Sequence, residues 1–579
     1  GAYQNNTEST RFFGNAYVEV APLKGLNLRS MFAVDRSDSR NGLYQDYQSQ
    51  QRYQSPSTSY IRQIRNNSTA ITWDNTINYN TTIAEKHDLT ALLGHELTQT
   101  VTESSTVGGD AGATHYYESG YNDLSKILSP VTTSTYVKTS MLSFFGRLNY
   151  SYASKYLLTA SLRADGSSTL AKGHKWGYFP SIAGAWTVSN EKFWEPIRNA
   201  VDYMKIRASY GIIGNQDIAP YSTLGTLEST GFSYGTNQSY TGYWANSFAT
   251  PDLTWEKVHQ FDLGVDLGFF GNRLSISFDY FNKTTKDALL QTAAPGYLGA
   301  TQYWVNAGEV NNKGVDVTIN GQIIQTKDWS WSSTLNASYI KNKVTKMTAD
   351  EPIIYGEKPA PGTVDPCTII KEGEAIGTFY GFKWAGVEKN DKGQYVDMYY
   401  AADGTKTASP NAGTDRFVLG RSNPDVTLGW NNTITYKNWD FNMFCNAAFG
   451  AKRLNIVRFA MNAEVGASRF VTDKDHFSNI GVTMPTIGAE NKNYGNSDKW
   501  LENADYFRCE NISVAYTFPR SVTKLADIRL SLSAQNLFTI TGYKGIDPAG
   551  ASFSDANVDR DNGLDMGAYP NPRTITMGV

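Results

Sequence analysis

The sequence predicts an all-β chain whose strands cross a membrane as an antiparallel β-barrel. Three observations predict this fold class. Apolar and polar residues alternate with a period of two over segments of about 10 to 13 residues, aromatic residues gather at the segment ends, and the connections alternate between short and long. Strands of globular proteins usually have about 5 or 6 residues. A tilted strand that crosses the hydrocarbon layer needs about 9 to 11.

The composition supports this class and excludes others. The 579 residues hold 52 Lys and Arg against 55 Asp and Glu, a near balance that excludes the concentrated positive charge of a nucleic-acid-binding protein. Charged residues make up 18%, below the roughly 25% of soluble domains, while aromatic residues reach 13%. No apolar run approaches the roughly 20 residues of a membrane-spanning helix. Alternation by itself also fits a soluble β-sandwich with one wet face.

Each predicted strand has one apolar and one polar face. Residues 261–269 carry apolar side chains at every second position, and after a turn at Gly271-Asn272 the chain returns through residues 274–280 with the same alternation. This pairing predicts an antiparallel hairpin. The same unit recurs, in chain order, at 142–152 with 156–162, at 315–319 with 329–339, at 428–436 with 439–449, and at 512–518 with 528–534.

The connections predict which end of each strand faces outward. Short turns are expected near 22–25, 80–87, 153–155, 270–272, 437–438 and 519–525. Long polar loops are expected at roughly 35–67, 98–139, 166–179, 213–257, 284–311, 451–505 and 541–571. Barrels of bacterial outer membranes have short periplasmic turns and longer outer loops, so the short connections are predicted to be periplasmic.

Counting strands by this alternation gives about 17. The stretch 341–425 fits best as one elaborate outer loop with a hairpin of its own. An odd number of strands does not close a bacterial single-chain barrel, so we expect further strands before residue 1. The chain also opens at Gly1 without Met or an apolar leader, which indicates a processed or partial chain. Three cysteines, far apart in the sequence, indicate neither a disulfide framework nor a metal cluster: Cys367, Cys445 and Cys509.

Several non-repeating motifs, in order along the chain, resemble those of the SusC/RagA family of TonB-dependent outer-membrane transporters. The resemblance covers essentially the whole chain. Its motifs are residues 163–168 (RADGSS), 175–181 (KWGYFPS), 193–196 (FWEP), 205–211 (KIRASYG), 214–216 (GNQ), 423–425 (NPD), 436–438 (YKN), 500–502 (WLE), 506, 511–513 (NIS), 535–538 (QNLF) and 569–573 (YPNPR).

This resemblance implies a barrel of about 22 strands, with a plug, a TonB box and an N-terminal domain that the sequence does not contain. Residues 1–579 are therefore expected to be a partial barrel, whose last strand starts at Thr574 and is cut short. The resemblance places the protein in the outer membrane of a Gram-negative bacterium of the Bacteroidota type, surrounded by lipid. It implies TonB-driven import together with a SusD-like surface lipoprotein, and transporter and lid pairs that form dimers.

The resemblance implies an oligosaccharide as cargo, with a peptide as the alternative. Aromatic residues of two long loops are expected to stack on sugar faces, and anchoring at the membrane interface or lid contacts explain them equally well. These loop residues are Tyr234, Tyr240, Tyr243, Trp244, Tyr297, Tyr303 and Trp304. Three charged residues on polar strand faces are expected to face the lumen and the plug: Arg147, Arg163 and Asp165.

Other chemistry has little support. Asp559, Asp561 and Asp565 alternate beside Gly563 in the manner of a short calcium loop, although a solvated acidic loop explains them better. His95-Glu96 lacks the second His of a zinc protease helix, and neither a G-x-S-x-G turn nor a Walker A loop is found. We therefore expect no enzyme and no required cofactor. Two alternatives to an importer are a surface adhesion barrel without transport and an open porin.

Overall fold

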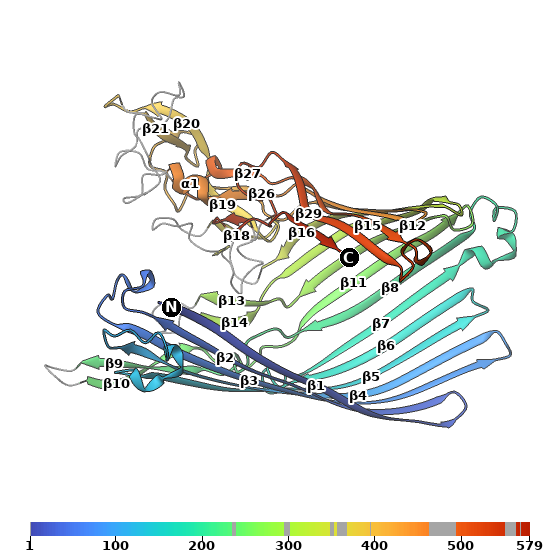
Figure 1. Cartoon of the computed structure of the whole chain (residues 1–579), viewed down its shortest axis with the longest axis horizontal. Helices are drawn as coiled ribbons and strands as arrows, with labels where there is room; N and C mark the ends of the chain where they lie inside the picture. The colour runs from blue at the N-terminus through green and yellow to red at the C-terminus, as the bar shows by residue number, and fades with distance from the viewer. Residues whose placement is uncertain are drawn as a thin grey trace. The chain divides into compact units, whose positions relative to one another are not determined.

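The chain is built on one large antiparallel sheet of 17 strands (Figure 1). A computed structural model describes residues 2–233, 239–293, 302–347, 352–355, 367–393, 395–462, 494–549, 563–567 and 569–579. The strands of this sheet are β1 (Tyr3–Leu23), β2 (Leu26–Gln45), β3 (Ser59–Ile83), β4 (His87–Ala111), β5 (Val131–Tyr152), β6 (Tyr156–Ser167), β7 (Trp176–Thr187), β8 (Tyr203–Asn215), β11 (Glu256–Phe269), β12 (Leu274–Lys286), β15 (Glu309–Gln325), β16 (Trp329–Lys346), β24 (Val426–Tyr436), β25 (Trp439–Phe449), β28 (Tyr506–Phe518), β29 (Ile528–Thr541) and β31 (Thr574–Gly578). The predicted all-β class, strand number and hairpins are confirmed.

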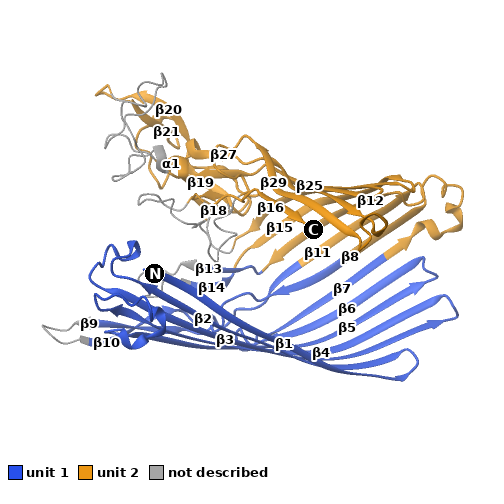
Figure 2. Cartoon of the chain, viewed as in Figure 1, with its two compact units in different colours: residues 1–184, 210–258, 287–306 blue, residues 185–209, 259–286, 307–579 orange. Residues whose placement is uncertain are grey.

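The chain divides into two compact units (Figure 2). The first holds residues 1–184, 210–258 and 287–306, and the second holds residues 185–209, 259–286 and 307–579. Each unit contains hairpins of the large sheet together with smaller sheets formed by the connections.

Strands β1 to β5 are longer than the sequence predicts, and Figure 1 shows them side by side. They have 20 to 25 residues, so the loops expected at 35–67 and 98–139 shrink to 46–58 and 112–130. The alternation of apolar and polar residues ends before the strands do, because both faces of β1 to β5 become polar within the segments that were expected to be loops. The backbone ladder continues because polar side chains pair across it, as Arg11 of β1 does with Asp35 of β2 at 2.8 Å.

The long connections form small sheets of their own. In the first unit, β9 (Thr226–Ser233), β10 (Ser239–Ser247), β13 (Leu289–Ala293) and β14 (Gln302–Asn306) form one sheet. In the second unit, the stretch 341–425 holds one sheet of β17 (Ile353–Tyr355), β18 (Thr368–Ile370), β19 (Thr378–Phe382) and β23 (Arg416–Arg421), and another of β20 (Trp384–Lys389), β21 (Tyr395–Tyr400) and β22 (Lys406–Thr407). The prediction of an elaborate loop with its own hairpin is confirmed.

The last two long connections of the second unit also join. Strand β26 (Lys452–Asn455) pairs with β27 (Leu501–Asn503) and with β30 (Leu564–Asp565), so the connections 450–505 and 542–573 share a sheet. The short helix α1 (Ile456–Asn462) follows β26, whereas α3 (Arg520–Thr523) lies in the short connection between β28 and β29. None of the helices in the described part of the chain has the length and apolar character needed to cross a bilayer.

Alternate side chains of the large sheet expose apolar surface. In the first unit Leu148, Leu158 and Leu162 are exposed, and in the second unit Phe278 and Leu532 are exposed. Soluble proteins rarely leave such apolar surfaces open to water. Because these residues occupy the predicted apolar faces, the outer side of the strands is suited to contact with lipid hydrocarbon.

The pairing of two of the cysteines was not predicted from the sequence. Cys445 of β25 and Cys509 of β28 are distant in sequence but lie directly opposite each other in the second unit. The two residues are far apart in the sequence because a long connection separates β25 from β28. Antiparallel pairing of the two strands brings the ends of that connection together.

Candidate functional site

A charged centre of the first unit surrounds Arg163 on the polar face of β6. Its guanidinium donates to Asp165 Oδ1 at 2.7 Å and to Ser143 Oγ at 2.8 Å, and it lies 3.4 Å from Glu96 Oε1. The guanidinium also covers the Phe145 ring, with 5.2 Å between Cζ and the ring centroid. The register of β4, β5 and β6 places these side chains in adjacent rows. Arg163 is therefore a bound structural charge of this face.

The structure brings together two of the three charged residues that the sequence singled out. Arg163 binds Asp165, whereas Arg147 is exposed and lies opposite Ser161, one row away from that pair on the same face. Contact of this face with a plug stays a prediction. His95 points to the other face, where its ring packs 5.5 Å from Trp73 and 5.2 Å from Phe144.

The second unit has a matching centre around Arg207 of β8, which the sequence analysis did not select. Arg207 binds both oxygens of Asp266 at 3.0 and 3.1 Å, and it also binds Asp279 Oδ2 at 2.8 Å and Ser277 Oγ at 3.0 Å. The sequence did indicate the partners of Arg207, because Asp266, Ser277 and Asp279 all lie on the polar faces of the predicted 261–280 hairpin. The missing information was that β8 pairs with that hairpin.

Gly264 of β11 provides the space for this centre. A Cβ atom there would lie 2.5 Å from Asp279 Oδ1 and 2.6 Å from Arg207 Cζ, closer than van der Waals contact. We expect Gly264→Ala to lower the free energy of unfolding by about 1 to 3 kcal/mol, because Arg207 is held by two carboxylates and has little freedom to move. Thermal unfolding in detergent measures this effect.

The matched control is Gly184→Ala, because a Cβ atom at Gly184 of β7 meets nothing within 4 Å. This control is expected to change the unfolding midpoint little or to raise it slightly. Equal midpoints for the two variants would show that Gly264 does not make room for Arg207.

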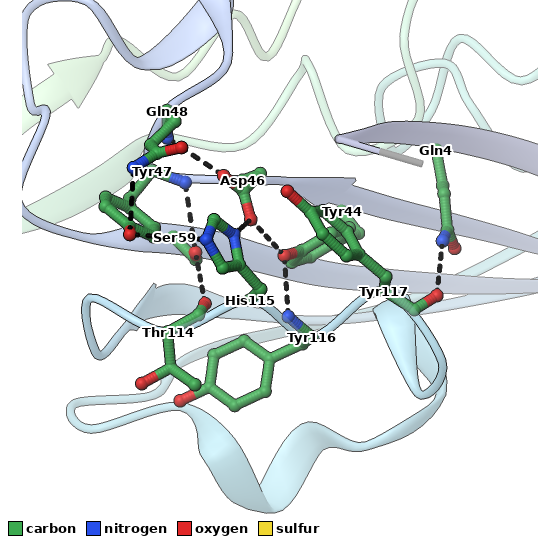
Figure 3. Close-up of polar contacts among 10 residues, drawn as sticks. All are labelled: Gln4, Tyr44, Asp46, Tyr47, Gln48, Ser59, Thr114, His115, Tyr116 and Tyr117. Atoms are coloured by element: carbon green, nitrogen blue, oxygen red, sulfur yellow. Dashed lines mark hydrogen bonds and ion pairs between the residues drawn. The ribbon is translucent and has the colours of Figure 1, made fainter.

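A buried carboxylate joins two connections of the first unit. Asp46 directly follows β2 and is fully buried, and its Oδ2 is bound by Tyr44 Oη and by His115 Nδ1, each at 2.8 Å. Oδ1 accepts the backbone N–H of Gln48 at 3.0 Å, and Tyr44 Oη accepts the backbone N–H of Tyr116 at 2.9 Å. Figure 3 shows the His115 ring and the Tyr44 hydroxyl converging on this carboxylate. The connection after β2 is thereby tied to the connection after β4.

Aromatic rings surround the exposed side of this Asp46 cluster. The ring centroid of His115 lies 4.9 Å from that of Tyr47 and 4.9 Å from that of Tyr117. Burial raises the pKa of Asp46, but hydrogen bonds from the Gln48 N–H, His115 and Tyr44 outweigh it, so this pKa lies below its ordinary value. Asp46 therefore stays ionised at neutral pH. The cluster was not predicted from the sequence, although both connections carry Tyr-rich segments at 44–47 and 115–117.

The aromatic residues predicted to contact cargo fall on the small sheet of β9, β10, β13 and β14. Tyr240, Tyr243 and Trp244 lie on β10 and are exposed, Tyr243 most of all at 71%. Tyr303 and Trp304 lie on β14, whose first residue pairs with the last residue of β10. The structure thus brings both predicted groups onto one sheet. Tyr234 and Tyr297 lie outside the described residues.

These aromatic residues are not equivalent. Trp304 packs against a hydrophobic cluster that includes Phe179 and Trp255, so it helps to hold the sheet in place. Tyr303 lies edge-on to Phe248, with 6.3 Å between ring centroids. Tyr240 and Tyr243 expose their rings most fully, and strand alternation directs them to opposite faces of β10. Contact of any of them with cargo stays a prediction.

The acidic calcium candidate is only partly described. Asp559 and Asp561 lie outside the described residues. Asp565 accepts the Tyr543 hydroxyl at 2.6 Å and the Gly567 N–H at 3.0 Å. Across the described ranges, no three His, Cys, Asp or Glu side chains are grouped as metal ligands. The calcium site stays a prediction.

Comparison with known proteins gives consistent matches. The sequence model of the family described as "TonB dependent receptor-like, beta-barrel" matches residues 2–537. TonB-dependent receptor P3 of Formosa agariphila is 34% identical over 89% of this chain and 52% of its own length. TonB-dependent receptor SusC of Bacteroides thetaiotaomicron is 28% identical over 77% of this chain and 44% of its own length. The chain spans about half the length of the curated relatives it matches.

A solved structure shares the fold. The structure titled "Structure of the RagAB peptide transporter" contains a chain that superposes with a TM-score of 0.85. The match covers the whole of the protein described here and 62% of the RagAB chain, at 24% identity. At this identity the match establishes the architecture, which is that of a large antiparallel β-barrel.

Proposed function

The chain belongs to the family of TonB-dependent receptor-like β-barrels, and from this membership we propose that it supplies barrel wall to an energised nutrient importer. It is an outer-membrane protein whose apolar strand faces contact lipid. Barrels of this size enclose a lumen too wide for their own side chains to fill, so transport requires a plug that moves. In this proposal the TonB complex supplies the energy through a segment outside residues 1–579, and a SusD-like lipoprotein closes the outer side.

The cargo that we propose is an oligosaccharide. The observation that carries this proposal is the pair of exposed tyrosine rings on β10, Tyr240 and Tyr243, in a chain with nearly balanced charge. An exposed Tyr ring offers an apolar face with a hydroxyl at its edge, which suits a sugar that has both apolar and hydroxyl-bearing sides. The arginines of the two charged centres, Arg163 and Arg207, are already bound by carboxylates, which leaves less charge for an ionic cargo.

Replacing Tyr240 or Tyr243 with Ala in the full-length complex is expected to weaken binding of its oligosaccharide by about 2- to 10-fold for each ring, since one aromatic contact contributes about 0.5 to 1.5 kcal/mol. Calorimetric titration of the detergent-extracted complex, with neutral oligosaccharides and with mixed peptides, measures this change. Tyr569→Ala is the matched control, because Tyr569 is fully exposed but lies outside the small sheet. Binding of peptides alone would replace the oligosaccharide proposal with peptide import.

The proposed partners are tested by the composition of the native complex. Mass spectrometry of the extracted complex is expected to find a surface lipoprotein together with a chain that continues upstream of residue 1. A chain that begins at Gly1 and purifies alone would exclude active transport by this polypeptide. It would leave the adhesion barrel or the open porin as its function.

A further inference from the structure

We propose that Cys445 and Cys509 form a disulfide bond that links β25 to β28. The two residues are register partners in the antiparallel pairing of these strands, so their side chains point to the same face. Both side chains are buried. This pairing is independent of the proposed transport function, and its test does not depend on any cargo.

The geometry of antiparallel pairing suits this bond. Directly opposite residues have Cα atoms about 4.5 or 5.5 Å apart, depending on whether the pair is hydrogen-bonded. Disulfides join residues with Cα separations of about 4.4 to 6.8 Å. Either kind of regular pair therefore falls within the range that a disulfide spans.

A bulge at Glu510 creates this pairing. The register runs from Phe444 opposite Asn511 to Cys445 opposite Cys509, which leaves Glu510 as the additional residue of β28. The Glu510 carboxylate accepts the side-chain amide of Asn446, the next residue of β25 after Cys445. Without the bulge, Glu510 would stand opposite Cys445 on the apolar face. A covalent bond at this point would hold the register where the ladder is interrupted.

The two sulfur atoms lie within an apolar row. Cys445 is 2% exposed and Cys509 is 1% exposed. Their outer register partners are Trp430 on β24 and Phe538 on β29. Once the strands have paired, soluble oxidants and reductants have little access to the sulfurs. The bond must therefore form before or during strand pairing, and it is protected afterwards.

The chemistry requires one external oxidant. An outer-membrane protein passes through the periplasm, which is kept oxidising by thiol oxidases that carry a reactive disulfide. The Cys445 thiolate attacks that disulfide and forms a mixed disulfide, and the Cys509 thiolate then attacks Cys445 Sγ and releases the oxidant as a dithiol. Two electrons pass to the oxidant, and the two protons lost from the cysteines end on its two thiols.

The test is alkylation of the chain extracted from outer membranes, denatured without reductant in the presence of N-ethylmaleimide and analysed by peptide mass spectrometry. We expect alkylation of Cys367 alone, and a linked pair of peptides containing Cys445 and Cys509 with a mass about 2 Da below the sum of the two reduced peptides. Cys367 is the internal control, because it lies in a separate hydrophobic cluster with Phe379 and Trp500. Direct alkylation of all three cysteines, or a linkage of either one to another molecule, would overturn the proposal.

Variants give a second measurement. Cys445→Ser is expected to make Cys509 alkylable without reductant, and Cys509→Ser is expected to do the same for Cys445. Reductant present during synthesis is expected to lower the thermal midpoint of the wild-type chain and of Cys367→Ser. It is expected to leave the double variant Cys445→Ala, Cys509→Ala unchanged. A midpoint of the wild-type chain that does not respond to reductant would also count against the bond.

Discussion

Replacing Asp397 with Asn is expected to destabilise the small sheet of β20, β21 and β22 by about 3 to 5 kcal/mol at neutral pH, the cost of breaking a buried ion pair. Asp397 is 1% exposed, and both of its carboxylate oxygens bind Lys499 Nζ at 2.7 Å. The indole N–H of Trp384 also donates to it at 2.8 Å. The variant leaves the Lys499 ammonium, 15% exposed, without its counter-charge in a site where little water replaces it.

Hydrogen exchange of peptides from residues 384–400 measures this change locally, which suits a chain with two units better than a global unfolding curve. At about a factor of ten for each 1.4 kcal/mol, the expected loss of protection is roughly 100- to 5,000-fold. The matched control is Glu388→Gln, because the pair of Glu388 with Lys406 lies on the same sheet but is exposed. Exposed pairs contribute about 1 kcal/mol or less. An equal effect of the two substitutions would contradict the role of burial.

The pH dependence of the Asp397→Asn variant provides an independent check. Burial lowers the pKa of Lys499 even in the presence of Asp397, which raises it. Without that carboxylate the pKa falls further below the unfolded value of about 10.4. At a pH between the folded-state pKa and the unfolded-state pKa of Lys499, the unfolded chain binds more protons than the folded chain. The stability of the variant therefore rises with pH in this range. The deficit should shrink from pH 7 toward pH 10, and a constant deficit would exclude this cause.

The large sheet could be predicted from the sequence because residues close together in the chain mark each strand and each turn. Alternation marks each strand, and a short polar turn such as Ala153 to Lys155 marks each hairpin, so the chain order alone establishes which strands are neighbours. The prediction lost accuracy where alternation ended. In β2 and β3 the strands continue through polar residues, and only the partner strand shows that the backbone ladder persists.

The side-chain centres could not be predicted in the same way because they depend on pairing between distant segments. Asp46 and His115 are 69 residues apart, and Asp397 and Lys499 are 102 residues apart. Each residue by itself resembles an ordinary polar residue of a loop. The opposition of Cys445 and Cys509 depends further on a one-residue bulge, which no alternating pattern indicates. The Arg207 centre is intermediate in this respect, because its partners can be predicted once β8 is known to pair with the 261–280 hairpin.

Replacing Arg508 with Met is expected to destabilise the second unit by about 3 to 5 kcal/mol, again as a broken buried pair. The side chains of Arg508 and Asp547 are 7% and 8% exposed, and the guanidinium binds the carboxylate. Arg508 also donates from Nε to Thr539 Oγ1 at 2.9 Å. The pair attaches the connection after β29 to β28. Without Arg508 the Asp547 carboxylate stays buried without this partner.

The loss of stability in Arg508→Met should be local to the connection after β29. Hydrogen exchange of peptides from residues 541–549 measures it. The double variant Arg508→Met, Asp547→Leu removes both charges, and we expect it to recover most of the loss, because apolar replacements of a buried pair are often neutral. A double variant as unstable as the single one would mean that Arg508 stabilises this region through its packing and its bond to Thr539.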